Sequence, residues 1–576
     1  MLQNSTDHEA VATAFDSHTR TENVSLYAPE ESPVDRRVAL VLFLLSFLYL
    51  CLFRRYTTME PDEGIILQGA RRILRGEVLY RDFFSFFTPG SYYFVALLSR
   101  IFGSSMLVAR STLAFYGGIF SAVIYLLSRR VCTRGISLIV VVLTMLTTLP
   151  FRFLVLHNWD STVWACLAVY SAVRWLESWN WKWASATGSF ISLTFLFEQS
   201  KGVGLVLGLA VGWLAIRFLD PEQQRGLSLL TSRQSLGLAL GLAWPFLITL
   251  AYFGAQHSLT DMLADWLWPL QHYSLANRVP YGYQNWSDET RHTLFGVGSI
   301  AVRFITMLTL SPCFLIPILP LIAVGLWFYW IGQMRRRLQP RAKCAYYVLI
   351  TATLSGLLLS VITVRADILH FMYLQPLFCL VLAWLVDGRD VPGKIFKPLR
   401  PALRAYFVIA FLLFTIPLLI RAVSAPNKLT TRRGVLTTPE KDTVVEYVQQ
   451  HVGPGETILV YPYLPLYYYL TATFSPTRHD YFQPGMNTGE QSQEMLTQLM
   501  SRPVRVVVFE SSFAEKIPNS WPGTPLNAIA NDPVADYVLR EYRSCKILKS
   551  PGNWRFLFMV RKDLSCSEAL APKVDQ

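Results

Sequence analysis

The first apolar stretch of the chain, VALVLFLLSFLYLCLF at residues 38–53, is followed after a short gap by MEPDEG at residues 59–64. A run of this length and apolarity indicates a transmembrane helix. Asp62 and Glu63 are therefore expected at a membrane surface, between a proline and a glycine. Ionisable side chains at such a depth are costly, which makes them functional candidates. The alternative is that both acids only stabilise a helix start, where the helix dipole favours negative charge.

The composition places the whole chain in a membrane. Its 576 residues are 52% hydrophobic and 16% charged, whereas soluble proteins carry about 25% charged residues. The apolar residues also occur in blocks. The net charge of +13 comes largely from basic loops, which is typical of membrane topology, and no basic stripe indicates nucleic-acid binding. We therefore predict a polytopic α-helical membrane protein.

About eleven transmembrane helices are predicted from apolar length, and their orientation follows from the Lys and Arg residues of the short loops. Residues 293–334 are ambiguous. Two spans there would leave the basic run 335–337 outside, so we choose one span, preceded by a surface helix at 294–308. The predicted spans are Val38–Phe53, Met106–Leu127, Ile136–Phe151, Thr162–Trp175, Ala184–Phe197, Val203–Phe218, Leu236–Phe253, Pro312–Met334, Tyr346–Val364, Phe371–Val386 and Leu403–Ile420.

The spans belong to a predicted transmembrane catalytic domain at residues 36–424. Residues 1–35 before it are polar and are predicted to form a disordered cytoplasmic tail. The first external loop, residues 55–105, is long enough to be functional. It contains two predicted amphipathic helices, Glu63–Leu74 and Ser91–Phe102, which we expect to lie along the membrane surface.

The composition changes after Arg421, and residues 425–576 are mostly polar. Their pattern predicts an α/β domain, which the odd number of spans places on the external face. Cys545 and Cys566 lie in this part, and they can pair if it faces an oxidising compartment. The sequence leaves this pairing open. The predicted elements are strands at Thr457–Tyr461, Val504–Phe509 and Phe556–Val560 and helices at Pro439–His451 and Glu490–Met500.

Polar groups recur where predicted spans meet the external surface. Loop ends are polar in any case, and this is the alternative explanation for each group by itself. Four groups at one depth, each with an ionisable residue next to an apolar span, are expected to converge on one cavity. The groups are Asp62 with Glu63; His157 with Asp160; Glu198, Gln199 and Lys201; and Arg365, Asp367 and His370.

This combination indicates a group transfer at the membrane surface. A carboxylate at that depth can take the proton from an acceptor hydroxyl or amine as it attacks. Nearby Lys and Arg side chains can bind a phosphate that leaves with negative charge. A donor with a lipid tail lies in the bilayer and presents its head group there. The pattern therefore favours transfer from a lipid-linked phosphate to an acceptor outside the cytoplasm.

Two aromatic clusters have two interpretations each. The loop 254–292 is rich in Trp and Tyr, which either lie at the level of the lipid headgroups or stack on sugars. A second cluster at the start of the C-terminal domain either covers the cavity or docks that domain on the membrane part. The residues are Trp266, Trp268, Tyr273, Tyr281, Tyr283 and Trp286 in the loop, and Tyr461, Tyr463, Tyr467, Tyr468 and Tyr469 in the domain.

The first loop resembles that of the GT-C class of integral-membrane glycosyltransferases. The nearest relatives look like bacterial aminoarabinose and lipopolysaccharide-core transferases and protein O-mannosyltransferases. The resemblance extends to the plan of many spans followed by an external α/β domain. It implies an inverting glycosyltransferase that uses a polyprenyl-phosphate-linked sugar in a bacterial cell membrane. The similar stretches are Pro61-Asp62-Glu63-Gly64, Gly76–Tyr80 with Arg81-Asp82, Pro89-Gly90-Ser91-Tyr92-Tyr93 and Phe102-Gly103-Ser104.

The resemblance also implies roles for individual residues. Asp62 would be the general base, with Glu63 as its neighbour or substitute and Asp160 as a second acid. Lys201, in the run Gln199-Ser-Lys-Gly202, and Arg365 would bind the donor phosphate. The remaining candidates for substrate binding are His157, Glu198, Asp367 and His370.

One stretch departs from the aminoarabinose transferases, which carry a Lys before Pro-Pro in the first loop. Here Phe86-Phe87-Thr88-Pro89 stands instead. This argues against an aminoarabinose donor and against lipid A as the acceptor. Arg81 is a candidate replacement for the missing charge at the donor phosphate.

Several alternatives stay open. A transporter or flippase of lipid-linked glycans would predict internal repeats and charges at mid-membrane, and the sequence shows neither. A ligase or polymerase of lipid-linked glycans would use the same donor, whereas a noncatalytic scaffold would not need acids at four span ends. No cofactor is certain, although Asp62, Glu63 and Asp160 offer the oxygen ligands that divalent cations prefer.

Overall fold

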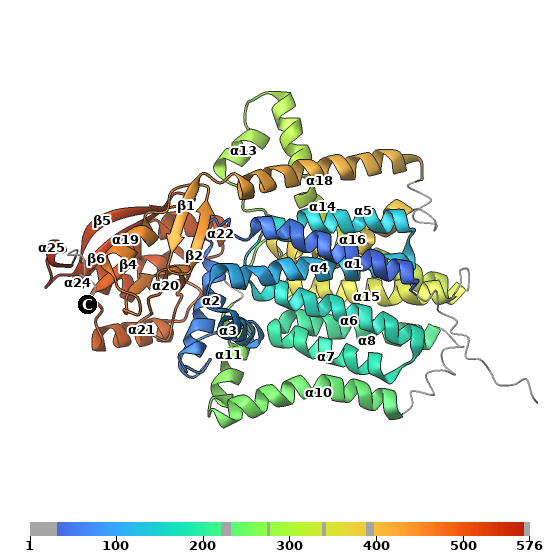
Figure 1. Ribbon diagram of the computed structural model, residues 1–576, viewed down its shortest axis with the longest axis horizontal. Helices are drawn as coiled ribbons and strands as arrows, with labels where there is room; N and C mark the ends of the chain where they lie inside the picture. The colour runs from blue at the N-terminus through green and yellow to red at the C-terminus, as the bar shows by residue number, and fades with distance from the viewer. Residues whose placement is uncertain (1–30, 220–231, 274–276, 337–340, 388–396, 570–576) are drawn as a thin grey trace, which may run out of the picture.

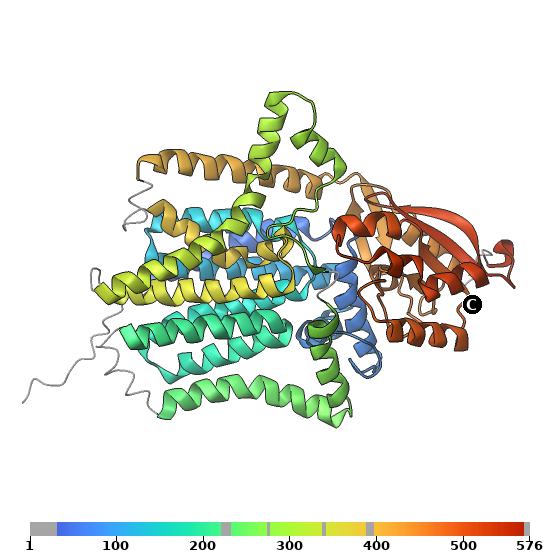
Figure 2. The same ribbon diagram turned by 180° about the vertical axis from the view of Figure 1, so that it is seen from behind.

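The computed structural model describes residues 31–219, 232–273, 277–336, 341–387 and 397–569. Figures 1 and 2 show a bundle of long helices at one end of the molecule and a C-terminal α/β domain at the other. Most of the predicted N-terminal tail lies outside the described residues. The first helix begins at Pro33, two residues before the predicted end of the tail.

The bundle consists of eleven long helices within the described residues. Each of the eleven predicted spans coincides with one of them, because the length of an apolar run can be read from the local sequence. The bounds differ by a few residues at most ends. The helices are α1 (Pro33–Leu50), α4 (Met106–Val131), α5 (Arg134–Thr147), α6 (His157–Ser178), α7 (Trp181–Phe197), α8 (Gln199–Leu219), α10 (Ser232–Ala255), α14 (Ile300–Arg336), α15 (Arg341–Val364), α16 (Ile368–Asp387) and α18 (Arg400–Val423).

Nine helices in the described part of the chain are long and apolar enough to cross a membrane. The other two bundle helices, α6 and α7, lie alongside them in both views. Helix α6 contains Asp160, Arg174 and Glu177, which lower its apolar character, and α7 has 17 residues. The structure thus confirms a polytopic helical membrane protein, and the count of about eleven spans stays a prediction.

Helix α14 differs from its prediction. A surface helix at 294–308 and a separate span from Pro312 were expected, but one helix of 37 residues covers this region and follows α13 (Asp288–Phe295). Prolines inside it do not end it, which is common in membrane helices. At 1.5 Å per residue α14 is about 55 Å long, more than the roughly 30 Å of a bilayer core. Helix α13 projects from the side of the bundle (Figures 1 and 2).

The first loop folds into the two predicted helices, α2 (Pro61–Leu74) and α3 (Gly90–Phe102). Proline suits the first position of α2 because its missing N–H is not needed there. Gly64 lets α2 pack directly on the backbone of α20 (Leu466–Leu470), since a Cβ at residue 64 would lie 2.0 Å from the backbone nitrogen of Leu466. The start of α2 therefore lies where the bundle meets the C-terminal domain.

The C-terminal domain is built on a four-stranded sheet in the order β3-β4-β6-β5. Strands β3 and β4 are parallel, and β6 runs antiparallel to both β4 and β5. The predicted strands correspond to β3, β4 and β6. Strand β5 and the hairpin β1–β2 were missed, because β5 is largely polar and exposed. The strands are β1 (Asn427–Thr431), β2 (Gly434–Thr438), β3 (Leu459–Tyr461), β4 (Val506–Glu510), β5 (Tyr542–Ser550) and β6 (Trp554–Arg561).

The remaining helices are short, and all but α11 belong to the C-terminal domain. Two of them, α19 and α21, correspond to the helices predicted in the C-terminal domain. Helix α11 comes from the loop after α10 and lies near α2 and α3, between the bundle and the domain (Figure 1). The helices are α11 (Leu259–His272), α19 (Val444–His451), α21 (Gly489–Ser501), α22 (Phe513–Ser520), α23 (Leu526–Ala530), α24 (Pro533–Glu541) and α25 (Cys566–Ala569).

Backbone pairing and two buried arginines join the C-terminal domain to the first loop. The N–H of Thr57 donates to the carbonyl of Thr437 on β2 at 2.9 Å. Arg71 on α2 donates to three backbone carbonyls of the domain, and Arg72 forms an ion pair with Asp480 at 3.0 Å. Buried charged groups need such partners, so α2 is bound firmly to both parts of the molecule.

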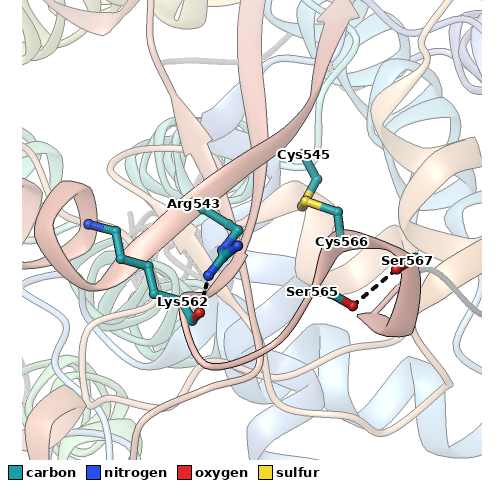
Figure 3. The surroundings of a disulfide bond; sticks show 6 residues. All are labelled: Arg543, Cys545, Lys562, Ser565, Cys566 and Ser567. Atoms are coloured by element: carbon teal, nitrogen blue, oxygen red, sulfur yellow. Dashed lines mark hydrogen bonds between the residues drawn. A yellow bond between two sulfur atoms is a disulfide. The ribbon is translucent and has the colours of Figure 1, made fainter.

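Cys545 and Cys566 form a disulfide bond, shown in Figure 3, with 5.7 Å between their Cα atoms. The bond links β5 to α25 at the end of the described chain. The sequence left this pairing open. Disulfides form and persist in oxidising compartments, so the bond favours the predicted external location of the domain.

Removal of this disulfide should destabilise the C-terminal domain. Replacing Cys545 by Ser should lower the free energy of unfolding by about 2–4 kcal/mol, because the cross-link restricts the unfolded chain. Thermal unfolding followed by limited proteolysis of the domain measures this. The free, half-buried Cys51 is the control, and Cys51→Ser should leave the domain unchanged. Equal stability of the parent chain with and without reductant would show that the bond does not form.

Candidate active site

A cavity of about 1230 Å³ lies where the bundle, the first loop and the C-terminal domain meet. Each of the four predicted polar groups contributes at least one side chain to its wall. The C-terminal domain adds several more. The acidic, basic and histidine residues of the wall are Glu60, Asp62, Arg152, His157, Glu198, Arg365, Asp367, His370, Arg421 and Lys516, and its tyrosines are Tyr273, Tyr283, Tyr373, Tyr463 and Tyr481.

Asp62 is held at the cavity wall by groups from both parts of the molecule. Arg152 Nη2 donates to its Oδ2 at 2.6 Å, and the Tyr463 hydroxyl donates to its Oδ1 at 2.7 Å. About a third of the side chain, 34%, is exposed. Burial and the adjacent Asp62 carboxylate raise the pKa of Tyr463 well above its usual value. The hydroxyl therefore stays protonated and fixes the orientation of the carboxylate.

Glu63, the neighbouring acid, points away from the cavity. It forms a fully buried ion pair with Arg110 on α4, with 2.8 Å between Arg110 Nε and Glu63 Oε1 and 2.5 Å between Nη2 and Oε2. Glu63 Oε1 also accepts the N–H of Val155 at 3.0 Å. Successive helical residues point about 100° apart, so this pairing sets the rotation of α2 that turns Asp62 to the cavity. Glu63 is not placed to substitute for Asp62.

Arg152 is a site residue that the sequence analysis missed. It follows the short helix η2 (Leu149–Phe151) and lies five residues before His157. Its Nη2 is also 3.7 Å from Glu60 Oε2. Its Nε is buried and has no hydrogen-bond partner among the described residues. The available signal was a basic residue directly after an apolar span. The direction of its side chain depends, however, on the fold of the following loop.

Glu198 and Lys201 were both predicted, but only Glu198 lines the cavity. Lys201 Nζ lies 2.9 Å from Glu198 Oε2, and it also donates to Asn158 O and Ser161 Oγ, both at 2.8 Å. The Ser161 hydroxyl donates to Glu198 as well, at 2.7 Å. The Lys201 ammonium is thus enclosed by protein acceptors and holds Glu198 in place. Its expected contact with a donor phosphate has no support from this position.

Two further predicted residues lie outside the cavity wall. Asp160 is buried and accepts a hydrogen bond from the Ser91 hydroxyl of α3 at 2.5 Å. Arg81 is exposed and pairs with Asp82 at 2.8 Å. His157 does line the cavity: its ring packs on Phe87 with centroids 4.1 Å apart, and its Nδ1 has no partner among the described residues.

The turn between α15 and α16, which was predicted to be external, forms a compact charged unit on the wall. Asp367 accepts hydrogen bonds from Arg365 Nε at 2.5 Å and from His370 Nδ1 at 2.6 Å. Burial disfavours the Asp367 carboxylate, but His370 and Arg365 outweigh this and hold its pKa below the usual value. Arg365 also donates to the carbonyl of Ser520 and lies 5.4 Å from the ring of Trp521, so the turn is bound to the C-terminal domain.

The C-terminal domain therefore forms one wall of the cavity rather than only docking on the bundle. Tyr463 reaches Asp62, and helix α22 presents Lys516, which lies over the ring of Trp554 at 4.5 Å. By contrast, Tyr467 and Tyr468 are buried inside the domain. The first interpretation thus applies to Tyr463, whereas Tyr467 and Tyr468 hydrogen-bond to Asp442 and Val460 within the domain and fit neither interpretation.

The opposite side of the cavity is apolar and reaches the outer surface of the bundle. It is lined by Val203 and Leu207 of α8 and by Leu359 of α15, whose side chains are 48%, 47% and 49% exposed. Both helices are long and apolar enough to cross a membrane, where exposed apolar groups can contact lipid. The cavity is also lined by Trp266, Tyr273, Tyr283 and Trp286, aromatic residues of the loop predicted to be external.

The acids considered as cation ligands do not share a site. Glu63 is paired with Arg110 and Asp160 with Ser91, and of the three acids only Asp62 lines the cavity. In the described ranges no group of three or more His, Cys, Asp or Glu residues is arranged to hold a metal ion.

Known proteins share the overall fold of this chain. Residues 88–250 match the family described as dolichyl-phosphate-mannose-protein mannosyltransferase. The crystal structure of apo ArnT from Cupriavidus metallidurans aligns with 91% of this chain and 97% of its own, at 13% identity and a TM-score of 0.51. The chain has a GT-C-like fold. This confirms the fold that the resemblance of the first loop implied.

Two other solved structures are similar at lower scores. ArnT from Cupriavidus metallidurans bound to undecaprenyl phosphate aligns over 91% of this chain and 97% of its own, with 13% identity and a TM-score of 0.48. The second is the archaeal oligosaccharyltransferase AglB from Archaeoglobus fulgidus, in complex with an inhibitory peptide and a dolichol-phosphate. It aligns over 93% of this chain and 76% of its own, with 12% identity and a TM-score of 0.44. No curated protein sequence matched the chain.

The two adjacent acids should respond differently to loss of charge. Glu63→Gln should destabilise the fold by about 3–5 kcal/mol, because it leaves Arg110 charged and unpaired in the interior. Asp62→Asn should cost less, at most about 1 kcal/mol, because this side chain is partly exposed and asparagine keeps an oxygen acceptor. Thermal melts of the purified protein in detergent measure both. Recovery of part of the loss in Glu63→Met with Arg110→Met is the internal control. A stable Glu63→Gln variant without activity would instead give Glu63 a chemical role.

Proposed function

We propose that this chain is a glycosyltransferase that moves a sugar from a polyprenyl-phosphate-linked donor to an acceptor on the extracytoplasmic side of a membrane, with Asp62 as the general base. The observation that carries the proposal is the position of Asp62. Its carboxylate lies on the wall of a cavity that is charged at one end and apolar, toward lipid, at the other. The match of residues 88–250 to dolichyl-phosphate-mannose-dependent transferases supports this class of donor.

In the proposed reaction an acceptor hydroxyl or amine attacks the anomeric carbon of the donor sugar. Asp62 takes the proton of the nucleophile, the new bond to the anomeric carbon forms, and the bond between that carbon and the phosphate oxygen breaks. Arg152 and Tyr463 hold the two carboxylate oxygens, so the base is oriented before the acceptor binds, which lowers the entropic part of the barrier.

The lipid phosphate leaves with additional negative charge, which needs cationic partners. Arg152 and Arg365, which are far apart in the sequence, both line the cavity. Arg152 Nε has no hydrogen-bond partner among the described residues. A planar guanidinium suits a phosphate because it offers parallel donors. Arg365 is further held by Asp367 and the C-terminal domain. In this proposal Arg365 keeps the role that the resemblance implied for it, and Arg152 replaces Lys201 and Arg81.

The two sides of the cavity suggest separate routes for the substrates. The apolar surface of α8 and α15 would accept the prenyl chain from the bilayer. The C-terminal domain, which we propose to be extracytoplasmic in line with its disulfide, covers the side from which an acceptor arrives.

Loss of the Asp62 carboxylate tests the general base. Asp62→Asn should lower transfer by about 10²- to 10⁴-fold, the usual contribution of a positioned base, while expression and melting temperature stay near those of the parent chain. Tyr463→Phe should lower transfer by about tenfold, because it removes one of the two groups that orient the base. Mass spectrometry of glycans and lipid-linked sugars from cells carrying each variant, or no chain, gives the readout. Full activity of Asp62→Asn would remove Asp62 from this role.

Binding of the lipid phosphate tests Arg152 separately from catalysis. Arg152→Met should weaken binding of undecaprenyl phosphate by about 10- to 100-fold, since it removes a charge-assisted contact. Native mass spectrometry of the detergent-solubilised protein measures this. Arg100→Met, at an exposed position of α3, should bind as the parent chain does. Unchanged binding by Arg152→Met would place the phosphate elsewhere in the cavity.

A further inference from the structure

Two polar side chains of the C-terminal domain line the cavity without a hydrogen-bond partner among the described residues. Gln483 is fully buried, and neither the nitrogen nor the oxygen of its side-chain amide is paired. The hydroxyl of Tyr481, two residues earlier, is also buried and has no partner in the part of the chain that the structure describes. Buried polar groups in proteins are nearly always hydrogen-bonded. This pair therefore points to a bound partner that is not part of the chain.

The backbone around Gln483 holds these side chains in place. The N–H of Gln483 donates to Asn487 Oδ1 at 2.9 Å, and its carbonyl accepts the N–H groups of Met486 and Asn487, both at 3.0 Å. Phe482, between the two residues, packs in the core of the domain with Tyr461, at 6.0 Å between ring centroids. The segment thus turns its apolar residue inward and offers its two polar residues to the cavity.

Aromatic rings flank the unpaired groups. The ring of Tyr481 lies 6.2 Å from the ring of Tyr463 and 6.2 Å from that of Phe86, and Trp521 lies 5.6 Å from Tyr463. All of these residues line the cavity. Tyr463 is the residue that donates to Asp62, so the unpaired groups adjoin the proposed base.

The chemistry of this set favours a neutral, hydroxyl-rich ring. A side-chain amide offers two donors and one acceptor, and a tyrosine hydroxyl offers one of each, which suits neighbouring hydroxyl groups. The aromatic rings provide apolar faces for the ring of the ligand. An acyl or prenyl chain would leave the amide unpaired, at a cost that specific sites avoid.

We propose that Tyr481 and Gln483 form a recognition subsite for a neutral sugar of the acceptor, so that the acceptor is a glycan or glycolipid. This rests on the proposed function, because it places that sugar beside the base. The subsite belongs to the C-terminal domain, whereas the apolar route for a lipid-borne donor belongs to α8 and α15. The sugar that meets Gln483 is therefore the one that comes from outside the membrane.

Glycan-array binding of the full-length protein in lipid nanodiscs tests the subsite without any transfer reaction. The parent chain and Asp62→Asn should both bind a subset of neutral glycans on an array that also carries acidic ones. Gln483→Leu should weaken binding to the same glycans at least about tenfold, and Tyr481→Phe should weaken it several-fold. The control is Gln493→Leu, the same change at an exposed position of α21, which should bind as the parent chain does.

Thermal stability separates recognition from a structural role. A leucine side chain has no amide to bury, so Gln483→Leu should melt at the same temperature as the parent chain or higher, while loss of a structural amide would give a lower one. The proposal is overturned if the parent chain binds no glycan, if it binds only acidic glycans, if Gln483→Leu binds as well as the parent chain, or if this variant melts lower. Full transfer by Asp62→Asn would contradict the general base but would leave these binding results unaffected.

Discussion

The ion pair between Glu63 and Arg110 is the interaction on which the rest of the site depends. It is fully buried and joins the first turn of α2 to α4, and the same carboxylate holds the backbone of Val155. Arg152 and His157 lie on either side of Val155, so one carboxylate fixes both the helix that carries Asp62 and the loop that carries its partner. A buried pair of this kind contributes little net stability. Here it sets the rotation of α2 and therefore the direction of the Asp62 side chain.

The second constraint is the close contact between α2 and the C-terminal domain. Gly64 allows the backbone of α20 to approach, and Arg71 and Arg72 bind the domain along the rest of the helix. Because α2 is held on both sides, the domain cannot be displaced without moving the start of α2. Tyr463 and the segment of Gln483 therefore belong to the cavity as much as the membrane-spanning helices do.

The cavity combines two environments that the proposed reaction requires together. Exposed apolar side chains of α8 and α15 line one part of it, and carboxylates, guanidinium groups and imidazoles from segments far apart in the sequence line another. Some of these groups serve each other. Lys201 neutralises Glu198, and Arg365 and His370 neutralise Asp367. Arg152 differs, because one of its donors is unpaired within the described residues.

The sequence by itself determined the helical membrane architecture, the two helices of the first loop and most of the central strands, because apolar length and periodicity are local properties. It did not determine which of two adjacent acids faces the cavity, that Lys201 points inward, or that Arg152, Tyr463 and Gln483 belong to the site. Those outcomes depend on partners distant in the chain: Arg110 is 47 residues from Glu63, and Tyr463 is 401 residues from Asp62. Only the tertiary structure brings such groups together, since the direction of a side chain is set by what packs against it.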